Sequence, residues 1–132
     1  MIETRARFLV QRHSTGRGHF DLRLIQDEQV RSWSMLKEPP SRPGQRRLAI
    51  EQESLSVDAI RGPIIEEDAF GAGRARLWDS GEVVVRTVTP QQIILVFMGK
   101  QLAGTYRLRR MRWYPGNRWL LERSRSPSSD ST

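Results

Sequence analysis

Two histidines, the only two in this 132-residue chain, lie six positions apart at His13 and His19. Asp21 and Arg23 follow His19 at alternate positions, and alternate residues of a β-strand point to the same face. A strand that begins at His19 therefore presents an imidazole, a carboxylate and a guanidinium on one face. Gly16 and Gly18 permit a tight reversal of the chain, which would bring His13 back towards His19.

Two imidazoles and one carboxylate, His13, His19 and Asp21, are a ligand set for a divalent metal of intermediate hardness such as manganese, zinc or cobalt. Such a metal leaves positions open for water and a phosphate oxygen, and it could polarise phosphorus and lower the pKa of a water. Arg23 would lie where it could hold a phosphate beside the metal. The alternatives are ordinary surface histidines and, for Arg23, a cross-strand salt bridge.

Further charged residues are weaker candidates for the same chemistry. Glu51 and Glu53 alternate on a predicted strand with Arg47, so one of the two acids could orient a ligand or accept a proton. Lys37 follows an apolar strand and precedes a Pro-Pro break, where a cation could reach over a barrel mouth. A solvated strand face and a plain surface lysine are the alternatives.

Three other segments have compositions that occur at binding sites. Glu66–Asp68 offers carboxylates but is more typical of a solvated loop, and Gly71–Gly73 indicates a turn rather than a phosphate-binding loop. Trp113 and Tyr114 could stack on bases, and edge-strand packing explains them equally well. The cations beside this aromatic pair are Arg109, Arg110, Arg112 and Arg118.

The composition adds a strong positive charge. The chain has 22 Lys plus Arg against 15 Asp plus Glu, a net charge of +7, and all but two of these cations are arginine. Because the arginine fork pairs with two phosphate oxygens at once, we expect a nucleic-acid partner; solvated arginines are the alternative. Cysteine is absent, which excludes disulfides and thiolate chemistry. Without a signal-peptide pattern or a long apolar run, we expect a cytoplasmic monomer that does not bind membranes.

Short runs of β-branched and aromatic residues recur along the chain and predict a mainly β fold. We expect a small closed or partly open β-barrel with at most one or two short helices, over residues 1–123, followed by a disordered tail at 124–132. Gln26–Gln29 and Asp79–Gly81 are predicted hairpin turns, and 54–69 an irregular excursion. The predicted strands are 8–11, 20–25, 30–35, 48–50, 75–78, 83–88, 93–97, 105–109 and 119–121.

Several blocks of the sequence, in order, resemble the 3′-phosphoesterase domain of the bacterial DNA ligase D family. The resemblance runs from about Arg7 to Arg123. The blocks that carry it are His13-x5-His19-Phe20-Asp21-Leu22-Arg23-Leu24, Ser32-Trp33-Ser34-Met35-Leu36-Lys37, Arg47-Leu48-Ala49-Ile50-Glu51, Phe70-Gly71-Ala72-Gly73, Trp78-Asp79-Ser80-Gly81, Gly99-Lys100-Gln101-Leu102-Ala103-Gly104 and Trp119-Leu120-Leu121.

The resemblance implies a compact β-barrel enzyme that binds manganese through His13, His19 and Asp21. From the length of the chain we expect this domain to be stand-alone. The resemblance also implies removal of a 3′-terminal ribonucleoside from DNA and then of the remaining 3′-phosphate, during double-strand break repair. The short chain leaves a further alternative open, a module that binds a ligase or polymerase partner in a repair assembly. The family's phosphate-contacting positions map to Arg23, Lys37 and Arg47, and a supporting catalytic acid maps to Glu53.

The active site departs from the family pattern at one block. Where the family reads Glu-Asp-His-Pro-Leu-Asp-Tyr, this chain reads Glu53 to Ala59, so Leu55 replaces a histidine and Ala59 stands near a missing tyrosine. Leucine neither donates nor accepts a proton, and a terminal phosphate carries about two negative charges. We therefore expect phosphodiesterase action on DNA 3′ ends to be favoured over phosphatase action. A catalytically silent nucleic-acid-binding or scaffold module is the alternative.

Overall fold

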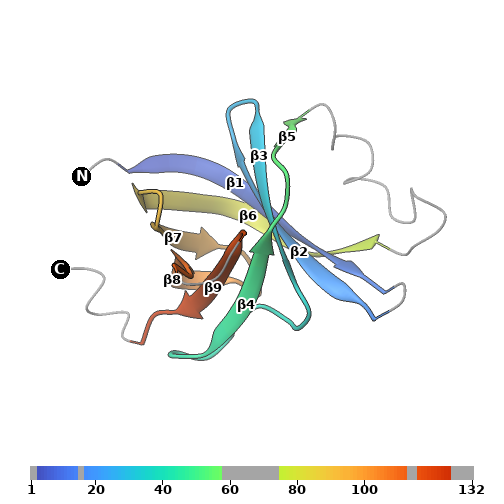
Figure 1. The fold of residues 1–132 in the computed structure, drawn as a ribbon. Coiled ribbons are helices and arrows are strands. Elements are labelled where there is room, and N and C mark those ends of the chain that lie inside the picture. Colours follow the sequence, from blue (N-terminus) through green and yellow to red (C-terminus); the bar gives the residue numbers. More distant parts are fainter. Residues whose placement is uncertain (1–2, 15–16, 58–74, 113–115, 126–132) are drawn as a thin grey trace.

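The structure, a computed structural model, describes residues 3–14, 17–57, 75–112 and 116–125 (Figure 1). All nine elements bounded within these residues are β-strands, in keeping with the predicted mainly β class. They are β1 (Thr4–His13), β2 (His19–Gln26), β3 (Gln29–Met35), β4 (Arg46–Glu51), β5 (Leu55–Ser56), β6 (Ala75–Val88), β7 (Gln92–Met98), β8 (Ala103–Arg110) and β9 (Arg118–Arg123).

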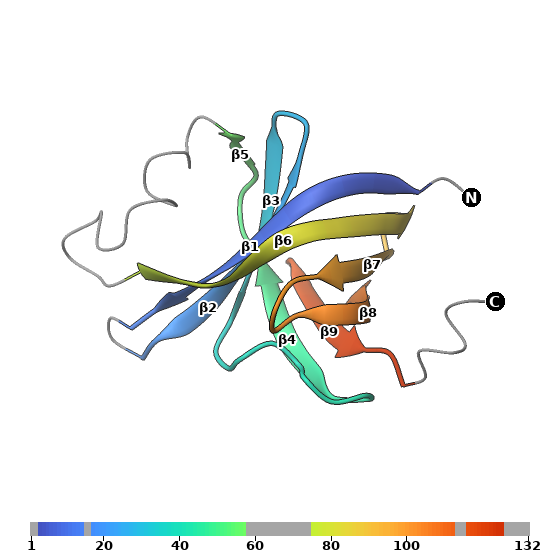
Figure 2. The ribbon, with the colours of Figure 1, turned by 180° about the vertical axis from the view of Figure 1, so that it is seen from behind.

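The strands form a closed antiparallel barrel. The sheet order is β2-β1-β6-β7-β8-β9-β4-β3, and an additional pairing of β2 with β3 closes the ring. The two-residue strand β5 pairs with the start of β3 and stands outside this ring. In Figure 2 the long strands β1 and β6 run side by side along the barrel. The prediction of a small closed β-barrel is confirmed.

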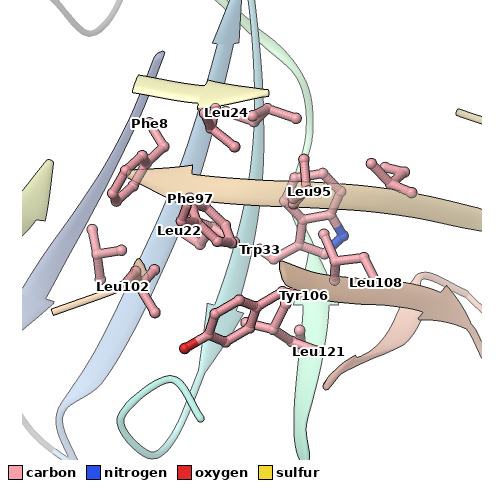
Figure 3. Packing of buried hydrophobic residues seen from close by; sticks show 14 of the residues in the cluster. Phe8, Leu22, Leu24, Trp33, Leu95, Phe97, Leu102, Tyr106, Leu108 and Leu121 are labelled. Carbon is pink, nitrogen blue, oxygen red and sulfur yellow. The ribbon is translucent and has the colours of Figure 1, made fainter. Parts of the chain in front are cut away.

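Alternating apolar residues fill the barrel interior. On β2, Phe20, Leu22 and Leu24 are buried and point into the barrel, whereas the residues between them face outwards. Aromatic rings pack edge to face at the centre, with centroids 4.8 Å apart for Phe8 and Phe97 and 5.2 Å apart for Phe97 and Tyr106 (Figure 3). The polar face of β2 therefore lies on the outer wall.

The predicted hairpin turn at Asp79–Gly81 is wrong, because these residues lie inside the 14-residue strand β6. The pairing of β1 with β6 shifts between Val10 and Gln11, so that Trp78 is a bulge residue whose ring packs on Phe20 at 5.9 Å. The buried Asp79 carboxylate accepts backbone hydrogen bonds from Lys100, Gln101 and Leu102 at 3.0, 2.9 and 2.7 Å. The residues that look like a turn in the sequence therefore follow a β-bulge at Trp78 and include a buried carboxylate, Asp79, that accepts hydrogen bonds from the backbone of the β7–β8 connection.

The other connections follow the predictions in part. The reversal at Gln26–Gln29 is confirmed, with Asp27 at a φ of 53°. The predicted excursion at 54–69 begins with β5, which the sequence did not indicate, and its residues 58–69 lie outside the described part of the chain. Beyond β9, the Ser124 amide donates to the Thr105 carbonyl at 2.9 Å, and 126–132 of the predicted tail lie outside the described residues. Within the described ranges, no helix has the length and apolarity needed to cross a membrane.

Candidate metal centre

The two histidines face each other across the first hairpin. His13 is the last residue of β1 and His19 the first of β2, and the two are direct cross-strand partners. Their rings stack with centroids 4.6 Å apart and planes 10° from parallel. Gly18, at a φ of +78°, supports the reversal between them in a conformation that side chains other than glycine rarely adopt. The predicted convergence of the two imidazoles is therefore present.

Asp21 completes a cluster of three side chains on the outer wall. Its Oδ2 atom lies 2.9 Å from His13 Nε2 and 3.4 Å from His19 Nε2. One ligand atom from each residue can be chosen so that all lie within 4.8 Å of one another. In the described part of the chain, this is the group of histidine and carboxylate side chains with a geometry that could hold a metal ion.

The state of His13 fits a metal ligand. Its Nε2 atom is buried and makes no hydrogen bond to any described residue, although Asp21 Oδ2 lies 2.9 Å away. A cation held by this nitrogen and Asp21 Oδ2 would satisfy both buried polar atoms. Burial lowers the pKa of His13 below 6.5; Asp21 opposes this shift, while His19 and Arg23 add to it. The neutral imidazole, which is the ligating form, is thus favoured at neutral pH.

Ser34 on β3 fixes the orientation of the Asp21 carboxylate. The two residues are direct partners in the β2–β3 pairing, and the Ser34 hydroxyl donates to Asp21 Oδ1 at 2.5 Å. With Oδ1 engaged, Oδ2 is the oxygen that faces both imidazoles. Asp21 is only 7% exposed, so this hydrogen bond also offsets part of the cost of burying a charge.

Arg23 continues the polar row that starts at His19. Its Nε atom donates to Gln11 Oε1 at 3.2 Å and its Nη1 atom to Ser32 Oγ at 3.0 Å. Burial lowers the pKa of Arg23 and the Asp21 charge opposes that shift, yet an arginine stays cationic in either case. Nη2 makes no hydrogen bond to a described residue, so one face of the fork remains available for an anion. The cross-strand partners of Arg23 among the described residues are thus the neutral side chains of Gln11 and Ser32, and not the acidic residue that the salt-bridge alternative requires.

The remaining predicted residues lie apart from the cluster. Lys37 is exposed and lines a hollow on the outer wall, which Arg47 also borders. Arg47 donates from Nε to the Glu38 carbonyl at 2.6 Å. Glu53 is exposed between β4 and β5 and is not part of the His13, His19 and Asp21 group.

Glu51 has a structural partner instead of a ligand. Its Oε2 atom lies 2.9 Å from Arg31 Nη2, and the Arg31 guanidinium stacks over the Trp33 ring at 4.9 Å. The strand face that carries Glu51 also carries the fully buried Ala49, so it points into the barrel. A solvated strand face, the alternative for this segment, is therefore wrong for Glu51.

Several weaker candidates fall outside the described residues. These are Glu66–Asp68, Gly71–Gly73, Trp113 and Tyr114, together with Ala59. Of the neighbouring cations, Arg109, Arg110 and Arg112 are exposed at the end of β8 and just after it. Leu55 is described: it lies in β5 and pairs with Val30.

Sequence reasoning missed the residues that support the cluster. Gln11, Ser32 and Ser34 are polar positions on the outward faces of β1 and β3, and Gln11 and Ser32 are only 3% and 2% exposed. Their alternation with apolar residues was visible in the sequence. Which of them meets Asp21 or Arg23, however, depends on the register between strands.

Comparison with known proteins gives a consistent result. Residues 11–110 match the family described as DNA Ligase D 3'-phosphoesterase domain. Over 121 residues the chain is 31% identical to the multifunctional non-homologous end joining protein LigD of Mycobacterium bovis, covering 88% of this chain and 16% of that protein. It is 37% identical over 76 residues to the LigD protein of Pseudomonas aeruginosa, covering 57% of this chain and 9% of that protein. The chain thus spans a small part of the length of these relatives.

Proposed function

Because the chain belongs to the family of DNA ligase D 3′-phosphoesterase domains, we propose that it is a metal-dependent phosphoesterase that trims the 3′ ends of DNA. The observation that carries the proposal is the convergence of His13, His19 and Asp21 within 4.8 Å, with the buried Nε2 of His13 lacking a hydrogen bond to any described residue. In this proposal the three side chains hold one divalent ion, with manganese as the first candidate and zinc or cobalt as alternatives.

The polar row, which consists of His19, Asp21 and Arg23 on the outward face of β2, and the residues around it have distinct chemical roles in this proposal. A divalent ion held by the cluster would draw charge from a phosphate oxygen and lower the pKa of a water. Ser34 keeps the Asp21 carboxylate turned towards the imidazoles through its hydrogen bond to Oδ1. Arg23, held by Gln11 and Ser32, presents its remaining N–H groups to a second phosphate oxygen beside Asp21. Lys37 and Arg47 contact phosphates farther along the strand, and Glu53 is a supporting acid.

The residue at position 55 favours cleavage of a phosphodiester over removal of a terminal phosphate. Leu55 pairs with Val30, which in turn pairs with Ile25, two residues beyond Arg23 on the same face of β2. The polar row therefore ends in an apolar group at the point where the family has a histidine. A terminal phosphate carries about one more negative charge than a diester. Stabilisation of a terminal phosphate therefore depends more on a proton donor at position 55 than stabilisation of a diester does. Without that donor, we expect the 3′-phosphate to be a poorer substrate than the phosphodiester.

The test uses two primer-templates that differ only at the 3′ terminus, one ending in a ribonucleotide and the other in a 3′-phosphate. With manganese, the protein should convert the ribonucleotide end faster than the phosphate end, and His19→Ala should remove both activities. Arg5→Ala is a matched control, because Arg5 is an exposed residue that pairs only weakly with Glu82. No change of either terminus at any manganese concentration would refute the catalytic proposal.

The loss of the family histidine at Leu55 also supports a second candidate, a catalytically silent module that binds nucleic acid. Both candidates predict salt-dependent DNA binding, since the net charge is +7. The silent module additionally predicts that binding survives His13→Ala and His19→Ala and that no end is ever changed. A single measured turnover that requires the histidines excludes it.

The relatives' printed names supply the cellular setting of the proposal. They are named as multifunctional proteins of non-homologous end joining, and we infer that this chain prepares DNA ends in the same process. Its partners would then be a DNA end and a ligase or polymerase that uses a 3′-hydroxyl, with the protein itself acting as a monomer. Copurification with such an enzyme on broken DNA is the corresponding test.

A further inference from the structure

A groove continues from the metal centre across the outer wall of β3 and β4. One hollow of about 430 Å³ is bordered by Gly18, His19 and Ser34, and a second of about 340 Å³ is bordered by Arg46 and Leu48. The two hollows share Ser34, Leu36 and Ile50, so we treat them as one feature, the β3–β4 groove.

The floor of the β3–β4 groove is apolar and open to solvent. Leu36 is 62% exposed and Leu48 is 47% exposed. Ile50 adds to this apolar floor, since it pairs directly with Ser34 and shares an outward strand face with Leu48. Large apolar side chains gathered beside a candidate active site indicate a binding surface rather than scattered surface residues.

The rim of the same groove is cationic. Among the described residues that line it, none is acidic, and the four charged ones are Arg17, Lys37, Arg46 and Arg47. A ligand for this groove must therefore combine negative charge with a flat apolar surface. An unpaired nucleotide has both, because its phosphate is anionic and the faces of its base are exposed when it is not stacked in a duplex.

We propose that the β3–β4 groove holds an unpaired nucleobase next to the reacting 3′ end, with the base lying on Leu36 and Leu48 and the flanking phosphate on Arg46. This rests on the proposed function and adds a preference among its substrates: 3′ ends whose last nucleotides are unpaired should bind more tightly. The register supports the placement, because Asp21, Ser34 and Ile50 are successive cross-strand partners. At about 4.8 Å per strand, Ile50 lies about 10 Å from Asp21.

The experiment measures binding without chemistry. Fluorescence anisotropy, with chelator present, compares a duplex carrying a short unpaired 3′ tail with the same duplex whose tail is abasic. The wild-type protein should bind the tail with bases about fivefold more tightly. The double variant Leu36→Ala/Leu48→Ala should lose this preference and keep the wild-type affinity for the abasic tail. Met98→Ala, whose side chain is also 47% exposed but does not line the groove, should behave as wild type.

Three results would overturn the proposal. The first is a double variant that still distinguishes the two tails as the wild type does. The second is tight binding of polyglutamate that depends on the two leucines, which would assign the groove to an acidic peptide. The third is equal binding of both tails by the wild type, whatever the variants do. Because no turnover is involved, an inactive protein can still pass this test and an active one can still fail it.

Discussion

The hydroxyl of Ser34 donates to Oδ1 of Asp21 across the β2–β3 pair at 2.5 Å, and this contact decides which way the carboxylate faces. Oδ2 is left 2.9 Å from His13 Nε2 and 3.4 Å from His19 Nε2. Hydrogen bonds to a metal-binding carboxylate set its orientation and basicity. Ser34 also borders the β3–β4 groove, so one residue joins the metal centre to the surface beside it.

Replacing Ser34 by alanine should weaken metal binding without unfolding the barrel. The Asp21 carboxylate loses the contact that fixes it, and removal of such a supporting partner lowers metal affinity by about 10- to 100-fold. Isothermal titration with Mn²⁺ measures the effect. Ser34→Thr, which keeps the hydroxyl, should stay close to wild type, and Ser56→Ala on the exposed position of β5 controls for loss of a serine elsewhere. Equal affinities for all four proteins would contradict a positioning role.

Adding and removing a metal should shift thermal stability. A ligand that binds only the folded state stabilises it by about 2.7 kcal/mol at a hundredfold excess over its dissociation constant. Manganese should therefore raise the midpoint of thermal unfolding, and EDTA should return it to the original value. Asp21→Asn keeps the side-chain volume but loses the charge, so its midpoint should not respond to manganese. A response in Asp21→Asn as large as in the wild type would place the ion elsewhere.

Restoring a histidine at position 55 should raise the 3′-phosphatase rate. In Leu55→His an imidazole replaces an apolar side chain beside Val30, at the end of the row that contains Arg23. A positioned proton donor contributes about 100- to 10,000-fold to such reactions; because the new group is not optimised, at least about tenfold is expected. Release of inorganic phosphate from a 3′-phosphate end measures it. Leu55→Gln, which is polar but does not transfer protons, should gain nothing; an equal gain there would contradict the interpretation.

The first hairpin could be predicted from the sequence because its signals are local. Residues alternate between apolar and polar from His19 to Leu24, and glycines mark the reversal before it, so the approach of His13 to His19 needed no knowledge of the rest of the chain. The contact of Ser34 with Asp21 could not be predicted in the same way. It requires the register of β2 against β3, and a slip by one residue would turn Ser34 into the core.

At Asp79, in contrast to the first hairpin, the local sequence led to a wrong prediction. Asp-Ser-Gly is a typical turn sequence, yet the strand continues through it because Asp79 finds its partners in the β7–β8 connection, more than 20 residues away. Gly81 is needed for a similar reason: a Cβ atom there would lie 2.7 Å from the Met98 carbonyl oxygen. The two requirements come from the close approach of β6 to β7 and to the β7–β8 connection, which no local sequence pattern indicates.

Removal of the Asp79 carboxylate should destabilise the barrel. Three backbone N–H groups, those of Lys100, Gln101 and Leu102, lose their acceptor in Asp79→Ala. The Leu102 contact is buried, and an unsatisfied buried donor costs about 1–3 kcal/mol. Since water can reach the other two in part, a loss of about 3 kcal/mol in the free energy of unfolding is expected from urea titration. Ser80→Ala, at the exposed neighbouring position, should cost less than about 0.5 kcal/mol. A similar cost for the two variants would contradict the capping role.

Tyr106 should make the barrel sensitive to alkaline pH. Its hydroxyl donates to the Pro40 carbonyl at 2.5 Å and accepts from Arg123 Nη1 at 3.2 Å, and the side chain is fully buried (Figure 3). Burial raises the pKa of Tyr106 above 10.0, and Arg123 only partly offsets this. A group whose pKa is higher in the folded state contributes its full stability below the unfolded pKa. That contribution is lost as the pH rises through the folded value, because the unfolded state ionises first.

Tyr106→Phe separates the two effects of the hydroxyl. Near neutral pH the variant should be less stable than wild type by about 1–2 kcal/mol, since the Pro40 carbonyl loses its donor inside the protein. Between about pH 8 and pH 11 the wild type should lose more stability than the variant, because only the wild type carries a phenol that ionises more readily when unfolded. Urea unfolding at both pH values measures the difference. Parallel losses in the two proteins would show that the folded phenol titrates normally, and would thereby contradict the buried hydrogen-bonded state that the structure assigns to it.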